Sequence, residues 1–161
     1  PYILHVLADN GYAALAYQLL LEREYPSWIY PITKGATTIW EHWDNIKPDG
    51  TFWSKDMNSF NHYAYGAVVD FIYEKVAGIR IDETDPGFKN IIFKPIVLKE
   101  CGLTYAKATI KTKNGDISAY WKIDGNKILY NFEVPKKSTA SIYLSNSYNV
   151  GPGTYEYIEQ L

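Results

Sequence analysis

Residues that could do acid–base chemistry gather in one aromatic stretch of the chain, residues 27–62. The stretch holds four of the five tryptophans, Trp28, Trp40, Trp43 and Trp53. Its ionisable residues include Glu41, His42, Asp44, Asp49, Asp56 and His62. Carboxyl groups cleave glycosidic bonds in pairs, since one protonates the leaving oxygen while the other attacks or activates water. Tryptophan rings offer flat apolar faces to sugars. The stretch is therefore typical of a carbohydrate-processing site.

Two other interpretations of the same residues remain open. A metal site would need His42 and His62 with nearby acids, but no His-x-x-His, His-x-x-x-His or Glu-x-x-His spacing occurs. Alternatively, the charges are solvated around a buried aromatic cluster, with Glu41 or Asp44 accepting a hydrogen bond from an indole N–H. Serine-hydrolase, dinucleotide and P-loop motifs are absent, and no pattern around the single cysteine, Cys101, suggests a nucleophile. We expect no metal and no cofactor.

Composition narrows the classes of partner. The 161 residues are 47% hydrophobic with a net charge of −2, which favours a folded chain and disfavours partners such as nucleic acid or a membrane surface. The longest apolar stretch, residues 13–21, is shorter than the about 20 residues that span a bilayer. Because the chain opens inside an apolar run without Met, we expect a piece of a longer protein, and its localisation stays unknown.

The elements that must position these residues are predicted to be helices in the first half. Apolar residues at three- and four-residue spacing predict a helix from Asp9 or Asn10, as N-cap, to Pro26. A second helix is predicted from Asn58 or Ser59 to Gly78, which would place Asn58, Asn61, His62 and Tyr65 on one face. Thr37 or Thr38 is expected to cap a short helical turn over residues 39–43.

In the second half the apolar spacing becomes two, which predicts strands. After an acidic connector over residues 81–87, the expected strands are centred on residues 91–93, 103–110, 117–123, 128–134 and 142–144, with a closing segment at 153–159. Asn114-Gly115 and Asp124-Gly125 mark hairpin turns, and the tract around Ser145 is interpreted as a loop. The pattern favours an antiparallel β-sandwich of five to seven strands, with Trp121 in its core.

Three blocks of sequence resemble a known family. GATTIWEHWD at 35–44, SFNHYAYGAVVDFIYEKVAGI at 59–79 and DPGFKNIIFKP at 85–95 occur in the order found in bacterial α-L-rhamnosidases of glycoside hydrolase family 78. A Trp-Glu-x-Trp followed about twenty residues later by Asn-His-Tyr-Ala is the most specific part. The resemblance covers most of the chain and is weakest over the strands.

The resemblance implies a two-part α+β architecture. Residues 1–82 would be the terminal helices of an (α/α)6 catalytic barrel, and residues 83–161 a C-terminal antiparallel, jelly-roll-like β-sandwich. The implied activity is the inverting removal of terminal α-L-rhamnose from glycosides or polysaccharides. The general acid would lie in an earlier part of the barrel, so this piece alone would be inactive.

Site residues follow from the same likeness. Glu41 falls on the family's general base and His62 on a residue of the sugar pocket, while Trp40 and Trp43 flank the base. Asn61, expected from the helical spacing to share a face with His62, completes the predicted substrate-binding set. His42 stands where many relatives carry Arg. The expected partners are a rhamnose-containing carbohydrate, the remainder of the barrel and a second copy of the chain, through apolar helix faces.

Alternatives from other classes remain. One is another (α/α)6 glycosidase or a polysaccharide lyase, although residues 27–62 offer an anionic substrate only Lys34, Lys47 and Lys55. Another is a non-catalytic carbohydrate-binding or structural β-sandwich, which would carry its ligand-facing aromatics on strands.

Overall fold

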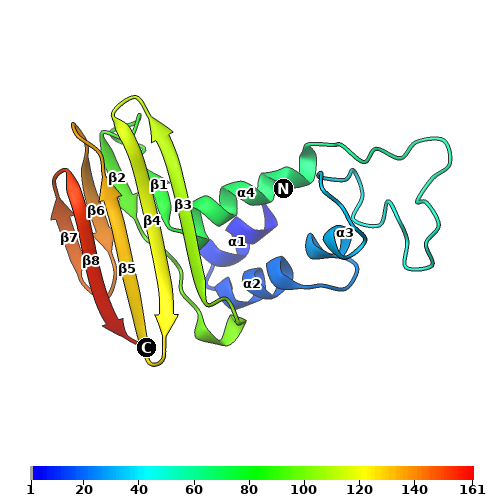
Figure 1. Cartoon of the computed structure of the whole chain (residues 1–161), viewed down its shortest axis with the longest axis horizontal. Helices are drawn as coiled ribbons and strands as arrows, with labels where there is room; N and C mark the ends of the chain where they lie inside the picture. The colour runs from blue at the N-terminus through cyan, green and yellow to red at the C-terminus, as the bar shows by residue number, and fades with distance from the viewer. Residues whose placement is uncertain (1) are drawn as a thin grey trace. The chain divides into compact units, whose positions relative to one another are not determined.

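Helices come first in the chain and strands follow, as the computed structural model describes them for residues 2–161 (Figure 1). Residue contacts divide the chain into two units that meet between Phe71 and Ile72. The domain boundary predicted between residues 82 and 83 stays a prediction. None of the helices in the described residues is long and apolar enough to cross a bilayer.

The first unit consists of helices and a long loop, residues 34–63. Its helical elements are α1 (Ile3–Asp9), α2 (Ala13–Leu21), α3 (Ile29–Thr33), the 3₁₀ turn η1 (Ala64–Ala67) and α4 (Val68–Phe71). Helix α1 packs against α2 and α4, with Leu4, Tyr17 and Phe71 fully buried among them. The rings of Tyr17 and Phe71 meet edge-on at 6.2 Å.

The helix predicted from Asp9 or Asn10 starts later, so that expectation is wrong. Asp9 is the last residue of α1, and the Asn10 side chain donates to the Val6 carbonyl at 2.8 Å, closing α1 rather than opening α2. Gly11, with φ of 87°, then reverses the chain in a conformation that side-chain-bearing residues avoid. Of the predicted helix, about 14 residues long, only the part that forms α2, Ala13–Leu21, is helical, and α1 is a separate helix that precedes it.

The start predicted for the second helix is also wrong. Helical structure begins at Ala64, whereas Asn58 and Ser59 lie in the loop and form hydrogen bonds across it. Residues 58, 61, 62 and 65 therefore do not share a helix face. The turn predicted over residues 39–43 is not helical either, because Thr38 donates its hydroxyl to the Phe60 carbonyl instead of capping a helix.

The second unit opens with the π-helical turn η2 (Ile72–Val76) and continues as two four-stranded sheets (Figure 1). Apart from the 3₁₀ turn η3 (Lys99–Cys101), its elements are β1 (Ile79–Ile81), β2 (Asn90–Phe93), β3 (Tyr105–Thr112), β4 (Gly115–Asp124), β5 (Lys127–Val134), β6 (Thr139–Tyr143), β7 (Ser147–Val150) and β8 (Gly153–Gln160). The sheet orders are β1-β2-β6-β7 and β3-β4-β5-β8.

The predicted sandwich and both hairpins are confirmed, but the unit has eight strands instead of the predicted five to seven and differs in its pairing. Strands β2 and β6 pair in parallel, so the sandwich is not purely antiparallel as predicted. The tract around Ser145, interpreted as a loop, contains β7 from Ser147 onward, because its residues pair with β6. Strand β1 precedes residue 82 and pairs with β2.

The core of this unit lies between the two sheets, where the two-residue spacing predicted it. Ile117, Trp121 and Phe132 are fully buried. Phe93 of one sheet stacks on Phe132 of the other at 4.6 Å between ring centroids. The Trp121 indole N–H donates to the buried Val76 carbonyl at 2.7 Å, so the core role predicted for Trp121 is confirmed.

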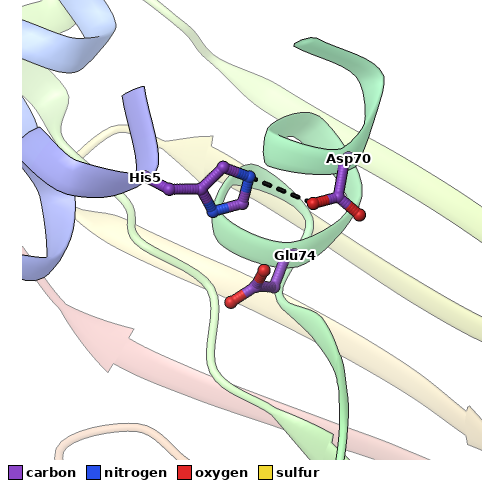
Figure 2. A group of neighbouring side chains, drawn as sticks. All are labelled: His5, Asp70 and Glu74. Atoms are coloured by element: carbon purple, nitrogen blue, oxygen red, sulfur yellow. Dashed lines mark ion pairs between the residues drawn. The ribbon is translucent and has the colours of Figure 1, made fainter. Parts of the chain in front are cut away.

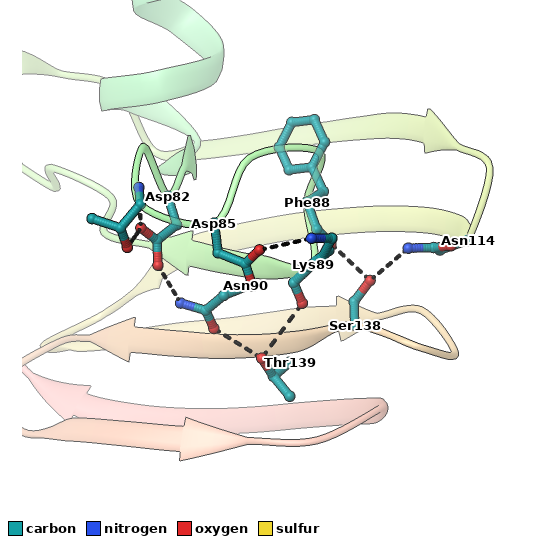
Figure 3. A network of polar contacts seen from close by, with 9 residues as sticks. Asp82, Asp85, Phe88, Lys89, Asn90, Asn114, Ser138 and Thr139 are labelled. Atoms are coloured by element: carbon teal, nitrogen blue, oxygen red, sulfur yellow. Dashed lines mark hydrogen bonds and ion pairs between the residues drawn. The ribbon is translucent and has the colours of Figure 1, made fainter.

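Polar contacts fasten the acidic connector to the sheet (Figure 3). The Asp82 carboxylate accepts from the Thr84 hydroxyl at 2.6 Å, from the Thr84 N–H at 2.9 Å and from the Asn90 side chain at 2.9 Å. The Thr84 hydroxyl and then the Asn90 amide hold the pKa of Asp82 below its usual value. The carboxylate thereby links the connector to the first residue of β2.

Candidate active site

Two segments of the long loop, residues 38–41 and 59–62, run side by side and surround Glu41. Three hydrogen bonds to backbone carbonyls join them, from the Thr38 hydroxyl to the Phe60 carbonyl, from the His62 N–H to the Ile39 carbonyl at 2.8 Å, and from the Glu41 N–H to the Ser59 carbonyl at 3.0 Å. These bonds link residues about 20 apart in sequence, so the loop has a fixed frame without being a helix or a sheet.

Within this frame the carboxylate of Glu41 is held as well as its backbone. The Ser59 N–H donates to Glu41 Oε2 at 3.1 Å, while the Glu41 N–H donates to the Ser59 carbonyl. The two residues therefore hold each other through reciprocal bonds. The side chain is half-buried. A carboxylate fixed in this way can accept a proton from a water molecule placed against it.

His62 lies beside a shallow, open hollow of about 580 Å³. The hollow is lined by Thr38, Ile39, Asn61, His62, Tyr63 and Gly66. The Ala64 N–H donates to His62 Nδ1 at 3.3 Å, so in neutral His62 the proton is on Nε2, which can donate to a ligand. The structure thus brings Asn61 and His62 together. Glu41 is not among the lining residues.

The two tryptophans that flank Glu41 have different surroundings. Trp40 is only 5% exposed and meets Phe60 edge-on at 5.1 Å. Trp43 is half-buried and stacks on Tyr65 at 4.8 Å, with Trp28 edge-on at 5.1 Å. The Trp28 indole donates to the Tyr65 carbonyl, whereas Trp43 Nε1 is buried and has no hydrogen-bond partner among residues 2–161. Trp40 therefore belongs to the local core, whereas the indole N–H of Trp43 is not used in a hydrogen bond within the described residues.

The other ionisable residues of the stretch have separate contacts. His42 stacks on Trp53 with ring centroids 3.8 Å apart. Asp49 accepts from the hydroxyl and the N–H of Thr51, at 2.7 and 2.9 Å, and the hydroxyl is the main cause of its lowered pKa. Asp56 is exposed. These contacts do not involve Glu41.

Asn45 was missed by the sequence analysis. Its side chain is fully buried and accepts from the His42 N–H at 3.0 Å while donating to the Ser59 carbonyl. An asparagine in a loop ordinarily indicates a turn, so its residue type does not distinguish it. The only sequence signal is its place one residue after the Trp-Glu-x-Trp-Asp run.

His5 was not considered in the sequence analysis either. Its Nε2 lies 3.1 Å from Asp70 Oδ2, an ion pair when the imidazole is protonated (Figure 2). The ring also meets Phe71 edge-on at 5.4 Å. His5 therefore joins α1 to α4 and does not belong to the loop around Glu41.

Comparison with protein families covers nearly the whole chain. The bacterial α-L-rhamnosidase 6-hairpin glycosidase domain matches residues 1–76, and the bacterial α-L-rhamnosidase C-terminal domain matches residues 78–156. The chain belongs to the bacterial α-L-rhamnosidases. Its helices correspond to the end of the hairpin domain and its two sheets to the β domain, as the fold prediction stated.

Individual α-L-rhamnosidases agree with this assignment. The chain is 41% identical over 144 residues to one from Streptomyces avermitilis, covering 89% of this chain and 14% of the relative. It is 39% identical to one from Formosa agariphila, covering 88% of this chain and 15% of the relative. The solved Streptomyces avermitilis enzyme complexed with L-rhamnose superposes with a TM-score of 0.89 at 34% identity, over 98% of this chain and 17% of that one. The chain thus spans roughly a seventh of the length of these curated relatives.

Proposed function

We propose that this chain supplies the general base, Glu41, to an inverting α-L-rhamnosidase that acts on rhamnose-containing carbohydrates. The observation that carries the proposal is the reciprocal pair of bonds between Glu41 and Ser59, which fixes the carboxylate at 3.1 Å from a backbone N–H. A base must be positioned before it can remove a proton in the transition state. The α-L-rhamnosidase relatives supply the substrate class.

The reaction assigned to Glu41 is proton removal from water. As the water oxygen bonds to the anomeric carbon, Glu41 takes one water proton, and the bond from that carbon to the leaving oxygen breaks. The leaving oxygen takes its proton from a general acid, so the sugar configuration inverts. An inverting pair needs about 6.5–9.5 Å between its carboxyl groups, to leave room for the water.

The remaining predicted residues have supporting roles in the proposal. His62 and Asn61 line the open hollow, where an imidazole N–H and an amide can bond sugar hydroxyls. Trp43 is the ring proposed to face the sugar, because it is half-buried and its Nε1 has no partner in the described part of the chain. Trp40, at 5% exposure, is proposed to act by packing under Glu41.

We also propose that the general acid lies outside these 161 residues, in the remainder of the hairpin barrel. The chain spans 14–15% of the two relatives compared above, which leaves most of the barrel unaccounted for here. The isolated chain should therefore bind to other barrel helices or to a second copy, and it should not hydrolyse p-nitrophenyl α-L-rhamnopyranoside. Measurable hydrolysis by the purified chain would contradict this part of the proposal.

The test of Glu41 uses a chimera in which this chain replaces the matching segment of the Streptomyces avermitilis relative, which is 41% identical. We expect the chimera to hydrolyse p-nitrophenyl α-L-rhamnopyranoside and to release β-L-rhamnose first, as proton NMR would record. The Glu41→Gln variant should lower kcat about 100- to 10,000-fold, because the amide keeps the shape and loses the proton acceptor.

Glu24→Gln is the matched control, since Glu24 is an exposed residue of the same unit outside the loop around Glu41. Its kcat should stay within twofold of the parent. A folded chimera without activity, a Glu41→Gln variant within tenfold of the parent, or α-L-rhamnose as the first product would each contradict the proposed function.

A further inference from the structure

A single buried side chain connects the segments that hold Glu41. Asn45 has no exposed surface, and it bonds to three parts of the loop. Its Oδ1 accepts from the His42 N–H at 3.0 Å and its Nδ2 donates to the Ser59 carbonyl, while its own carbonyl accepts from the Trp53 N–H at 3.0 Å and from the Asn58 side chain at 3.1 Å. A buried amide is tolerated only when both of its ends are bonded, as they are here.

Both ends of this amide act on the surroundings of Glu41. The His42 N–H belongs to the peptide group that directly follows Glu41, so Oδ1 fixes the chain on that side. The Ser59 carbonyl also accepts from the Glu41 N–H, and the Ser59 N–H donates to the Glu41 carboxylate. Through Nδ2, Asn45 therefore fixes Ser59, and Ser59 in turn fixes Glu41.

The geometry calls for asparagine in particular. One end must accept from an N–H and the other must donate to a carbonyl, within a single short planar group. Aspartate would place an oxygen against the Ser59 carbonyl oxygen, and leucine would leave the His42 N–H and the Ser59 carbonyl without these partners. Each of these changes removes at least one buried hydrogen bond, so one of the segments beside Glu41 is no longer held by residue 45.

We propose that Asn45 is the positioning residue for the general base. The proposal rests on the proposed role of Glu41 and goes beyond it by naming what aligns the carboxylate with the attacking water. Displacement of a reacting group by about 1 Å costs on the order of 100-fold in rate. Sugar binding, assigned to the hollow beside His62, should be little affected.

The test measures kcat and the affinity for L-rhamnose in the chimera described above. Asn45→Asp, which loses one of the two side-chain bonds, and Asn45→Leu, which loses both, should lower kcat about 100-fold or more while the Kd for L-rhamnose stays within threefold. Thr51→Val is the local control, because it removes the exposed hydrogen bond to Asp49 from the same loop, and its kcat should not change.

Azide distinguishes a displaced base from a damaged fold. The azide anion attacks the anomeric carbon with its own electron pair, the bond to p-nitrophenolate breaks, and rhamnosyl azide of inverted configuration forms without removal of a proton. Sodium azide should therefore raise turnover at least tenfold in Asn45→Leu and in Glu41→Gln. If turnover were lost because the variant does not fold, azide would not restore it.

The outcomes separate the two proposals. If Glu41→Gln abolishes turnover while both folded Asn45 variants stay within tenfold of the parent, the inference on Asn45 is wrong and the proposed function stands. A parallel loss of L-rhamnose binding and kcat, or no azide effect in Asn45→Leu, also overturns it. If Asn45→Leu does not fold, Asn45→Asp decides by the same measurements. Full activity in Glu41→Gln overturns the proposed function instead.

Discussion

Replacing Trp121 by phenylalanine tests the core of the β unit most directly. The indole is fully buried and donates to the Val76 carbonyl at 2.7 Å, so Trp121→Phe removes both a hydrogen bond and part of a ring. A buried carbonyl that loses its donor costs about 1–3 kcal/mol. A void of about 40 Å³, at roughly 24 cal/mol per Å³, adds about 1 kcal/mol. The expected loss of stability is about 2–4 kcal/mol.

The assay should resolve segments, because the two units need not unfold together. Hydrogen exchange followed by mass spectrometry reports the opening of β4 and β5 separately from the helices. A loss of about 2–4 kcal/mol corresponds to about 30- to 700-fold faster exchange of the slowest amides in β4. Peptides from α1 and α2 serve as the internal reference.

Tyr105→Phe is the matched variant, since Tyr105 lies in the same sheet with its side chain 60% exposed. Loss of its hydroxyl should leave exchange in β4 unchanged. A rise of less than fivefold in Trp121→Phe would refute the reasoning, because it would mean that neither the Val76 bond nor the ring contributes to the opening free energy.

Two further predictions concern the same unit. Gly78 has φ of 86°, and a Cβ there would lie 2.2 Å from the Pro95 nitrogen, so Gly78→Ala should cost several kcal/mol in urea unfolding, against about 1 kcal/mol for Gly125→Ala in open space. The pKa of Asp82 is lowered on folding, so its contribution to stability is present above the unfolded value of about 4 and is lost as pH falls through the folded value. Thr84→Val, which removes the main cause of that shift, should reduce the acid sensitivity of unfolding measured between about pH 5 and pH 2.

The strands were predictable because burial between two sheets imposes a period of two. Ile117, Ala119 and Trp121 alternate with more exposed residues and all three are fully buried. Glycines at 115 and 125 located the hairpins. What the period could not give was the order of the strands, because the parallel pair β2–β6 joins residues about 50 apart in sequence.

The helices were less predictable, since their ends depend on polar side chains with more than one use. Asn10 could have opened a helix and instead closes the preceding one. Asn58 and Ser59 could have capped a helix and instead bond across the loop to Asn45 and Glu41. Capping residues predict a helix end well only where no tertiary partner competes for the same side chain or backbone group.

The candidate site follows the same logic. Glu41 was identified by resemblance, because the run Trp-Glu-x-Trp is a string of side chains that can be compared between sequences. Its partner is the backbone of Ser59, whose N–H and carbonyl any residue other than proline could provide. Such a backbone contact cannot be inferred from residue types. The buried amide of Asn45 bonds the peptide group that follows Glu41 and shares the Ser59 carbonyl with the Glu41 N–H, and the folded loop is needed to reveal it. In this unit, therefore, apolar spacing predicts that helices flank the loop but not where they begin, while the geometry of the proposed base is set by polar contacts that have no period.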